Sequence, residues 1–197
     1  GSQSGAGSRK SQTNLLAVIG VMLAAVLGGG AYWYLTLPHP AESKLDKAIT
    51  GNKILKPAGE NAYEFYKQLK QQGADPKVLA KFEDRLYPIL TDRPKELLKT
   101  VLEPGITEKR VEEWQDAVKM LEWAVDMRPS ENQVAAKAAY CKGRVHYLLE
   151  QKDQAIEQWK KSADLDKKWA LPLNGIGLIF NERRDYDTAR TWLRQAV

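Results

Sequence analysis

The side chains that could carry catalysis in this sequence are one cysteine, two histidines and a few pairs of neighbouring carboxylates. Glu112 and Glu113, like Asp185 and Asp187, could act as an acid and a base only in a pocket that shifts their pKa values. Both pairs fall on charged helical faces or in turns. Cys141 lies on an apolar stripe, which favours a buried thiol over a nucleophile. We therefore predict no enzyme activity for these residues.

Metal, phosphate and nucleic-acid sites also have little support. Two histidines, His39 and His146, leave little for a histidine-based site, and one cysteine supports no multi-cysteine metal site and no internal disulfide. The glycine run 28–30 lies inside an apolar stretch and not in a phosphate-binding loop. The 30 Lys and Arg exceed the 25 Asp and Glu by 5, but these charges are interspersed. We expect no cofactor, no metal and no nucleic-acid partner.

The longest uncharged run covers 23 residues, Leu15 to Leu37. A helix of that length crosses a hydrocarbon core of about 30 Å. The aromatic residues 32–34 at its end suit the headgroup boundary, and Pro38 and Pro40 then end the helix. We predict a transmembrane helix over 14–37. The alternative is a cleaved signal peptide, whose apolar core is usually about 7–15 residues long.

The flanks of this run indicate its orientation and pairing. Arg9 and Lys10 precede it without acidic neighbours, which favours an N-terminus inside and residues 38–197 outside the cytoplasm, in the periplasm. Small residues recur every four positions on one face of the run, at Gly20, Ala24 and Gly28. This spacing lets two helices approach closely, so it predicts a homodimer through the membrane helix.

From residue 41 onward the apolar spacing is helical, and no stretch alternates as a strand does. Asp75 and Pro76 are typical of a cap and a first helical turn. Pro88 is expected to distort the end of that helix, and Asp92 and Pro94 are expected to open another. The whole chain divides into a Gly/Ser linker, the membrane helix, a juxtamembrane segment, a helical region with a degenerate repeat and a repeat region: 1–13, 14–37, 38–58, 59–105 and 106–197.

The repeat region has a period of 34 residues. The same series of small and large residues occurs at Gly143, Ala155, Trp159 and Ser162 and again at Gly177, Ala189, Leu193 and Ala196. Small residues are needed where two helices of a pair cross, and the large residue fills the gap between them. A period of 34 with a helix–turn–helix pattern resembles the tetratricopeptide repeat (TPR) family. The resemblance implies an all-α fold in which antiparallel helix pairs form a short right-handed solenoid.

Two further stretches extend this resemblance. An earlier half-repeat matches only the second helix of the template, at Ala117, Leu121, Ala124 and Pro129. The spacing of Ser130 and Gln133 is typical of a capping box that opens the next helix. The residues 51–66 are similar to extracytoplasmic helical regions of large bacterial membrane proteins. Receptor-type serine/threonine kinases are one such group, so this likeness implies a kinase outside these residues, in a chain cut at both ends.

The TPR resemblance also implies where a partner binds. In the family, the first helix of each repeat lines a concave face. The matching positions offer cations, aromatic rings and amides: Lys137, Tyr140, Arg144, Tyr147, Asn174 and Asn181. This set suits an extended peptide, and a solvated face without a ligand is the alternative. The core stripe behind it is predicted at Val134, Ala138, Cys141, Val145 and Leu148.

These features together favour a membrane-tethered protein–protein interaction module. We expect it to be the sensor or scaffold region of a bacterial signalling protein, with a protein or peptide ligand and with a lipid bilayer around residues 15–37. The alternative is a structural or assembly scaffold of the cell envelope that has no signalling output.

Overall fold

The computed structural model describes residues 40–101 and 110–196. Within these residues every regular element is a helix, so the predicted all-α class is confirmed for this part of the chain. The described helices are α2 (Pro40–Thr50), α3 (Ala62–Gln71), α4 (Pro76–Lys99), α5 (Val111–Met127), α6 (Asn132–Leu148), α7 (Lys152–Leu165), α8 (Leu171–Glu182) and α9 (Tyr186–Gln195).

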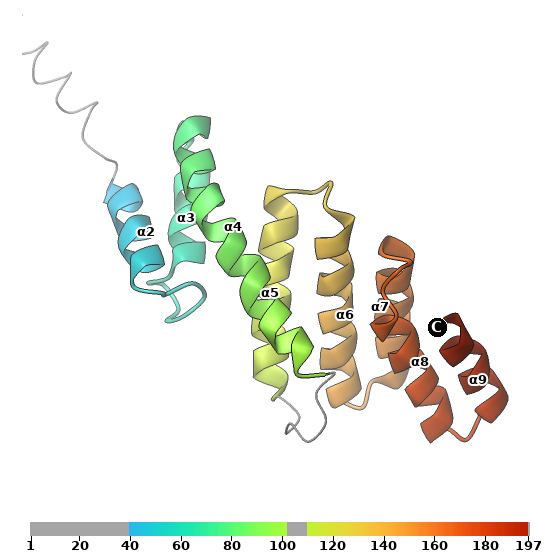
Figure 1. Ribbon diagram of the computed structural model, residues 1–197. Coiled ribbons are helices and arrows are strands. Elements are labelled where there is room, and N and C mark those ends of the chain that lie inside the picture. Colours follow the sequence, from blue (N-terminus) through green and yellow to red (C-terminus); the bar gives the residue numbers. More distant parts are fainter. Residues whose placement is uncertain (1–39, 102–109, 197) are drawn as a thin grey trace, which may run out of the picture.

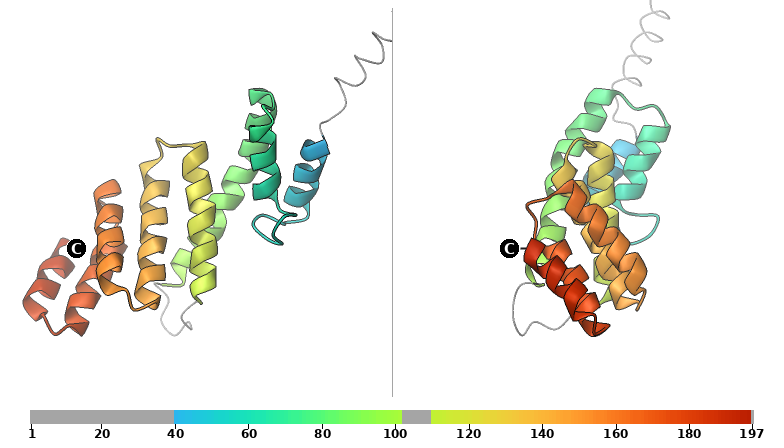
Figure 2. Two further views of the ribbon diagram at one scale, coloured as in Figure 1. Left: turned by 180° about the vertical axis from the view of Figure 1, so that it is seen from behind. Right: turned by 90° about the vertical axis from the view of Figure 1, so that its right-hand side faces the viewer.

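The helices from α4 to α9 stand side by side in an elongated stack, with α2 and α9 at its two ends (Figures 1 and 2). The main helix–helix contacts join helices that are consecutive in the sequence. Each helix therefore buries its apolar face against its sequence neighbours, which is how repeat solenoids are stabilised. The predicted arrangement of stacked antiparallel helix pairs is confirmed for the described residues.

The crossing of α6 and α7 is built around Trp159. A Cβ atom on Gly143 of α6 would lie only 2.3 Å from the Trp159 ring, and a Cβ atom on Gly175 of α8 would lie 2.7 Å from it. Trp159 is fully buried, and its Nε1 donates a hydrogen bond to the carbonyl oxygen of Tyr140 at 3.1 Å. The indole thus fills the space that two glycines leave open.

The crossing of α8 and α9 repeats this geometry one period later. A Cβ atom on Gly177 would lie 2.7 Å from Cγ of Leu193. Ala155 on α7 and Ala189 on α9 are both buried at the matching positions. The 34-residue spacing therefore predicted two equivalent helix crossings correctly.

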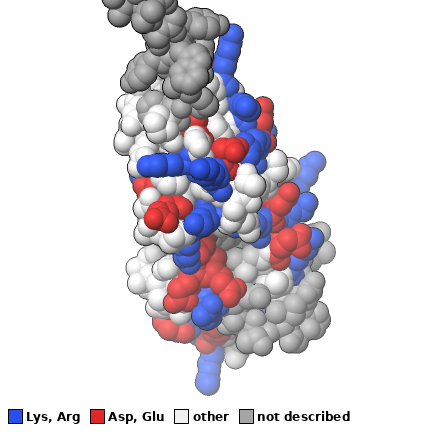
Figure 3. All heavy atoms as spheres, turned by 90° about the vertical axis from the view of Figure 1, so that its left-hand side faces the viewer, with Lys and Arg blue, Asp and Glu red and all other residues white. Residues whose placement is uncertain are grey.

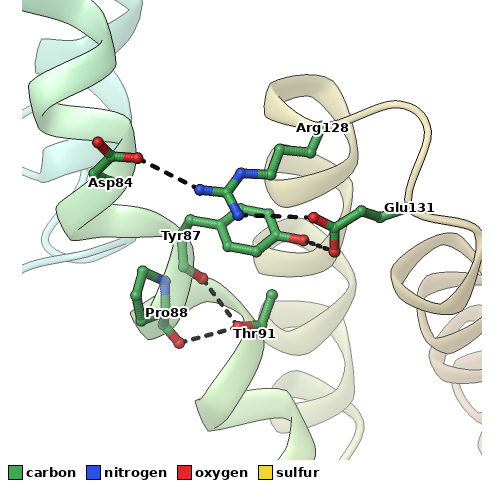
Figure 4. A network of polar contacts seen from close by, with 6 residues as sticks. All are labelled: Asp84, Tyr87, Pro88, Thr91, Arg128 and Glu131. Carbon is green, nitrogen blue, oxygen red and sulfur yellow. Dashed lines mark hydrogen bonds and ion pairs between the residues drawn. The ribbon is translucent and has the colours of Figure 1, made fainter.

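The helix α4 differs from the prediction at its prolines. It continues through Pro88 and Pro94 to Lys99, so the expected end of this helix before Asp92 and the new helix from Asp92 are wrong. Each proline removes one backbone hydrogen bond. Between the two prolines, the hydroxyl of Thr91 donates to the carbonyl oxygens of Tyr87 and Pro88 at 3.0 and 3.2 Å (Figure 4). Pro94 is itself buried, as are Leu90 and Leu98 of the same helix.

The start of α6 also corrects the sequence prediction. Glu131 is the N-cap residue and makes no side-chain cap hydrogen bond, so the predicted capping box at Ser130 does not form. The Glu131 carboxylate instead accepts a hydrogen bond from the Tyr87 hydroxyl of α4 (Figure 4). The Arg128 guanidinium lies 3.8 Å from the Tyr87 ring centroid and 3.5 Å from the Asp84 carboxylate. This cluster joins α4 to the α5–α6 turn.

The pair α2 and α3 packs on the N-terminal side of the stack. Asn61 caps α3 by accepting from the Glu64 N–H, and its amide donates to two carbonyl oxygens of the preceding loop. The rings of Tyr63 and Tyr66 lie 5.0 and 5.5 Å from the Trp123 ring of α5. Aromatic packing therefore attaches this pair to the repeat region.

The predicted transmembrane helix over 14–37 lies outside the described residues, as do its Gly20, Ala24 and Gly28 face and the linker 1–13. Among the helices that the structure describes, none has both the length and the apolar character needed to span a bilayer.

Candidate partner-binding grooves

The helix α6 presents two opposite faces, and each is a candidate binding surface. The predicted residues on α6 are Lys137, Tyr140, Arg144 and Tyr147. A second set at helical spacing is Ala135, Ala138, Ala139 and Lys142. At about 100° per residue, the centres of these two sets lie roughly 160° apart around the helix. The structure treats the two faces very differently.

Tyr140 is a core residue and not an exposed anchor. Only 2% of it is exposed, and its ring lies 5.9 Å from the Trp159 ring and 5.0 Å from the Trp169 ring. Burial raises the pKa of Tyr140 well above its ordinary value. The expectation that Tyr140 lines an open face is therefore wrong, because two tryptophans from the next helix and loop cover it.

Arg144 and Tyr147 are half-buried and engaged with neighbouring side chains. The Arg144 guanidinium lies 5.5 Å from the Trp114 ring and 5.3 Å from the Tyr147 ring. The Tyr147 hydroxyl donates to Glu182 of α8 at 2.5 Å, and Lys152 of α7 lies 2.9 Å from the same carboxylate. These contacts join α6, α7 and α8 on the predicted face.

The Glu182 carboxylate at the centre of this cluster was not among the predicted site residues. Partial burial acts to raise its pKa, but hydrogen bonds from Tyr147 and Lys152 outweigh burial and hold the pKa below its ordinary value. The carboxylate is therefore kept ionised for its two donors. The sequence carries no signal for this contact, because 35 positions separate Tyr147 from Glu182.

The other predicted residues remain accessible. Asn174 and Asn181 are exposed on α8, and Leu178 between them is 44% exposed. Lys137 is half-buried on α6. The predicted face therefore keeps an open strip on α8, while its α6 part is filled by the protein's own side chains.

The opposite face of α6 is the floor of a groove. A cavity of about 490 Å³ lies over α6, with α5 on one side and α7 on the other. A second cavity of about 420 Å³ continues along α5 and α6 and shares Lys119, Glu122 and Lys142 with the first. We call these two cavities together the first groove. From Ala135 to His146 it follows α6 for about 16 Å, or three helical turns.

The first groove has an apolar floor and a charged rim. Ala138 and Ala139 are buried in its floor, and Trp123 and Leu165 also line it. The rim carries three lysines and two carboxylates: Lys119, Lys142, Lys161, Glu122 and Asp126. The Lys142 ammonium pairs with Glu122 at 2.6 Å across the middle of the groove. Among the described residues, Lys119 and Lys161 form no ion pair, so the rim offers two further cations.

A second groove lies one repeat further along the same side. It has a volume of about 560 Å³ between α7, α8 and α9 and is lined by Lys160, Ala163, Asp164, Lys167, Leu173, Trp192 and Gln195. Lining residues of the first groove have counterparts 34 positions later in the second, as in Asp126 and Lys160, Gln158 and Trp192, and Lys161 and Gln195. The two grooves are thus related by the repeat. Leu173 replaces the floor residue Ala139, so only the first groove has an alanine floor.

Sequence reasoning missed the first groove because its floor resembles ordinary helix packing. Ala135, Ala138, Ala139 and Lys142 follow one face of α6, but small residues on a helix usually mark a crossing with a neighbour. Only the arrangement of α5 and α7 on either side shows that a groove runs over this face.

Cys141 and His146 are both engaged within the fold, and His39 lies outside the described residues. Cys141 is fully buried, and burial raises the pKa of its thiol to about 12, which keeps it protonated and unreactive. His146 Nδ1 lies 2.7 Å from the Gln151 side-chain oxygen. In the described part of the chain no three His, Cys, Asp or Glu side chains gather where they could hold a metal ion.

Comparison with known proteins yields structures but no family. No family model and no curated protein matches the chain. One crystal structure of MamA is 21% identical over 81% of this chain and 94% of its own, with a TM-score of 0.35. MamA 41-end from Desulfovibrio magneticus RS-1 is 20% identical over 80% and 94%, with a TM-score of 0.34. At such TM-scores whole folds do not superpose, and we base no functional statement on this similarity.

Proposed function

We propose that this protein is a protein-interaction module, tethered to a membrane by residues 15–37, whose partner binds in the first groove. The observation that supports this proposal most strongly is the groove itself, which is open, apolar at its floor and repeated in outline one period later. Solenoids of stacked helix pairs present extended surfaces of this kind to protein partners.

The shape and charge of the first groove favour one type of occupant. Its length of about three helical turns matches a short helix, and a floor of alanines lets a helix backbone approach closely. Lys119 and Lys161 project from opposite walls of the groove, on α5 and α7. We infer an amphipathic helical segment whose apolar face meets the alanine floor and whose flanking acidic residues meet these two lysines.

The proposed membrane tether is inferred from the uncharged run and from its length. A run of 23 uncharged residues is long enough to cross a bilayer. Its last residue lies three positions before α2, so the helical stack would stand directly at the membrane surface. An extracytoplasmic orientation, a signalling output and a kinase elsewhere on the polypeptide remain predictions, as does the alternative of an envelope scaffold.

The groove is tested by reversing its rim charges. In the full chain, Lys119→Glu with Lys161→Glu should reduce recovery of the bound partner at least about tenfold in quantitative affinity purification from membranes, because both ion pairs become repulsive. Both lysines are exposed, so the variant should keep the melting temperature of the unchanged chain. A partner recovered fully by this variant would exclude the first groove as its site.

The control introduces two glutamates on the other face. Asn174→Glu with Asn181→Glu alters two exposed residues of the open strip on α8. Partner recovery should be unchanged in this control. A loss confined to this control would instead locate the partner on the face that the TPR resemblance predicts.

The tether has a separate test. The full chain should stay in the pellet when membranes are washed with alkaline carbonate, and a chain without residues 15–37 should move to the supernatant. A full chain that is released by carbonate would exclude a membrane-spanning segment but would leave the groove proposal intact.

A further inference from the structure

The helix α2 separates its side chains into three faces. Its buried apolar residues are Ala41, Leu45, Ala48 and Ile49. At about 100° per residue, Lys44 and Lys47 point to one side of this apolar face, while Glu42 and Asp46 point to the other. A short helix with nearly balanced charge therefore presents one basic side and one acidic side.

The acidic side of α2 is engaged by the rest of the protein. Asp46 is exposed but accepts a hydrogen bond from the Arg85 guanidinium of α4 at 2.6 Å. Glu42 is half-buried and also interacts within the protein. Lys44 and Lys47 are both exposed, and neither forms an ion pair with another described residue. The contact with Arg85 thus occupies the acidic side of α2 and leaves the basic side without a paired carboxylate.

An open cavity extends this basic side. It has a volume of about 430 Å³ and is lined by Lys44, Lys47, Ala48, Lys53, Gly59, Glu60 and Phe65. The Lys44 ammonium lies 5.9 Å from the centroid of the Phe65 ring. Three ammonium groups face one carboxylate, that of Glu60, so the cavity favours an anion. We call Lys44, Lys47 and Lys53 the basic pocket.

Figure 3 views the molecule from this end, where basic and acidic side chains both occur on the described surface and several basic side chains project from its upper half.

The position of the basic pocket in the sequence defines how far it lies from the proposed membrane helix. Lys44 follows the last residue of the uncharged run, Leu37, by seven positions. Even a fully extended chain covers only about 25 Å over that distance. The tether therefore holds the pocket near the headgroup region at all times, where the local concentration of lipid phosphates is high.

We propose that the basic pocket binds the phosphate groups of anionic phospholipids in the membrane that holds residues 15–37. The proposal rests on the membrane tether of the proposed function. Lysines near an anionic bilayer each strengthen attachment about fivefold, and Phe65 beside them offers an apolar surface for the glycerol end of a headgroup. Binding would orient α2 against the bilayer and so set the direction in which the helical stack and its grooves project.

The test measures how fast individual lysines react in the full chain. The protein is reconstituted in nanodiscs of phosphatidylcholine alone or with about one third phosphatidylglycerol, treated with acetic anhydride and analysed by mass spectrometry. Lys44, Lys47 and Lys53 should react at least about fivefold more slowly in the anionic discs, as expected for one lysine–phosphate contact each. In high salt this difference should disappear, because salt screens the attraction.

The matched control is a second group of lysines far from the pocket. Lys160, Lys161 and Lys167 are exposed near the other end of the stack, on α7 and just after it, and should react equally in both discs. Equal rates for the basic pocket in both discs would overturn the proposal. In a further arm, soluble glycerol phosphate is added to protein in phosphatidylcholine discs. If it slows acetylation of the pocket lysines as much as the anionic discs do, the lipid assignment is overturned and the ligand is a free phosphate.

A variant tests whether the three lysines act together. In anionic discs, Lys44→Gln with Lys47→Gln should remove most of the protection of Lys53 against acetylation. Lys44→Arg with Lys47→Arg should keep this protection. Protection of Lys53 that survives the glutamine variant would contradict a shared site. A full chain that fails to enter either disc would overturn both the tether and the basic pocket, whereas a chain that enters but shows no protection overturns the pocket alone.

Discussion

The two helix crossings of the repeat region share one template but differ in how firmly they are closed. At the α6–α7 crossing, Trp159 is fully buried between Gly143 and Gly175. At the α8–α9 crossing, Leu193 faces Gly177 but remains 42% exposed. A large side chain that is clamped on both sides cannot move away from an added atom, whereas a half-exposed leucine can. Equivalent positions in the two repeats therefore give the same crossing geometry but do not contribute equally to the free energy of unfolding.

The largest expected effect is at the closed crossing. Gly143→Ala places a Cβ atom 2.3 Å from a ring that has no free space around it, so the free energy of unfolding should fall by about 3 kcal/mol. Urea denaturation followed by circular dichroism measures this loss. A decrease below about 1 kcal/mol would show that Trp159 can shift and that the crossing is not closed.

The next effect concerns a hydrogen bond that only the first crossing has. The Ser162 hydroxyl is buried and donates to the Ala136 carbonyl oxygen at 2.7 Å, while Ala196 stands at the matching position of the second crossing. Ser162→Ala should lower the free energy of unfolding by about 1 kcal/mol. Urea denaturation of the variant and of the unchanged chain measures this loss. An unchanged urea midpoint would show that the hydrogen bond makes no net contribution to stability.

A third difference depends on pH. Cys141 lies in the first pair, where burial raises the pKa of its thiol to about 12, while its repeat counterpart is Gly175. Above pH 9 the unfolded thiol ionises and the folded thiol does not, so stability is present below pH 9 and falls as the pH rises. At pH 10 the expected loss from this group is about 1 kcal/mol.

This loss is measured as the difference in urea stability between pH 8 and pH 10. Cys141→Ala provides the control, because it removes the titrating group and should reduce the pH dependence by the same amount. An identical pH dependence in the two proteins would contradict the assignment to Cys141.

The smallest expected effect is at the open crossing. Gly177→Ala brings a Cβ atom to 2.7 Å from Leu193, but this side chain can rotate toward solvent. The free energy of unfolding should fall by less than about 1 kcal/mol, well below the loss at Gly143. Equal losses for the two alanine variants would show that the α6–α7 and α8–α9 crossings are equally rigid.

The sequence predicted the repeat well and its surface poorly. Gly143 and Ala155 recur 34 positions later as Gly177 and Ala189. A fixed period of this kind indicates which residues meet within each helix pair. Tyr140 occupies a position that usually lines an open face, yet Trp169 from the loop before α8 covers it. Pro88 breaks helices in isolation, but α4 continues through it in the folded chain.

The sequence by itself determined the all-α class, the 34-residue period and the pairing of small with large residues at each crossing, because these depend on local spacing along a helix. Only the tertiary structure decided which faces of α6 are open. It covered Tyr140 with tryptophans and left a groove open between α5 and α7 over the opposite face, because the way one helix pair stacks on the next depends on contacts between residues distant in the chain. For the same reason, the division of α2 into a basic and an acidic side became meaningful only once Arg85 of α4 engaged Asp46.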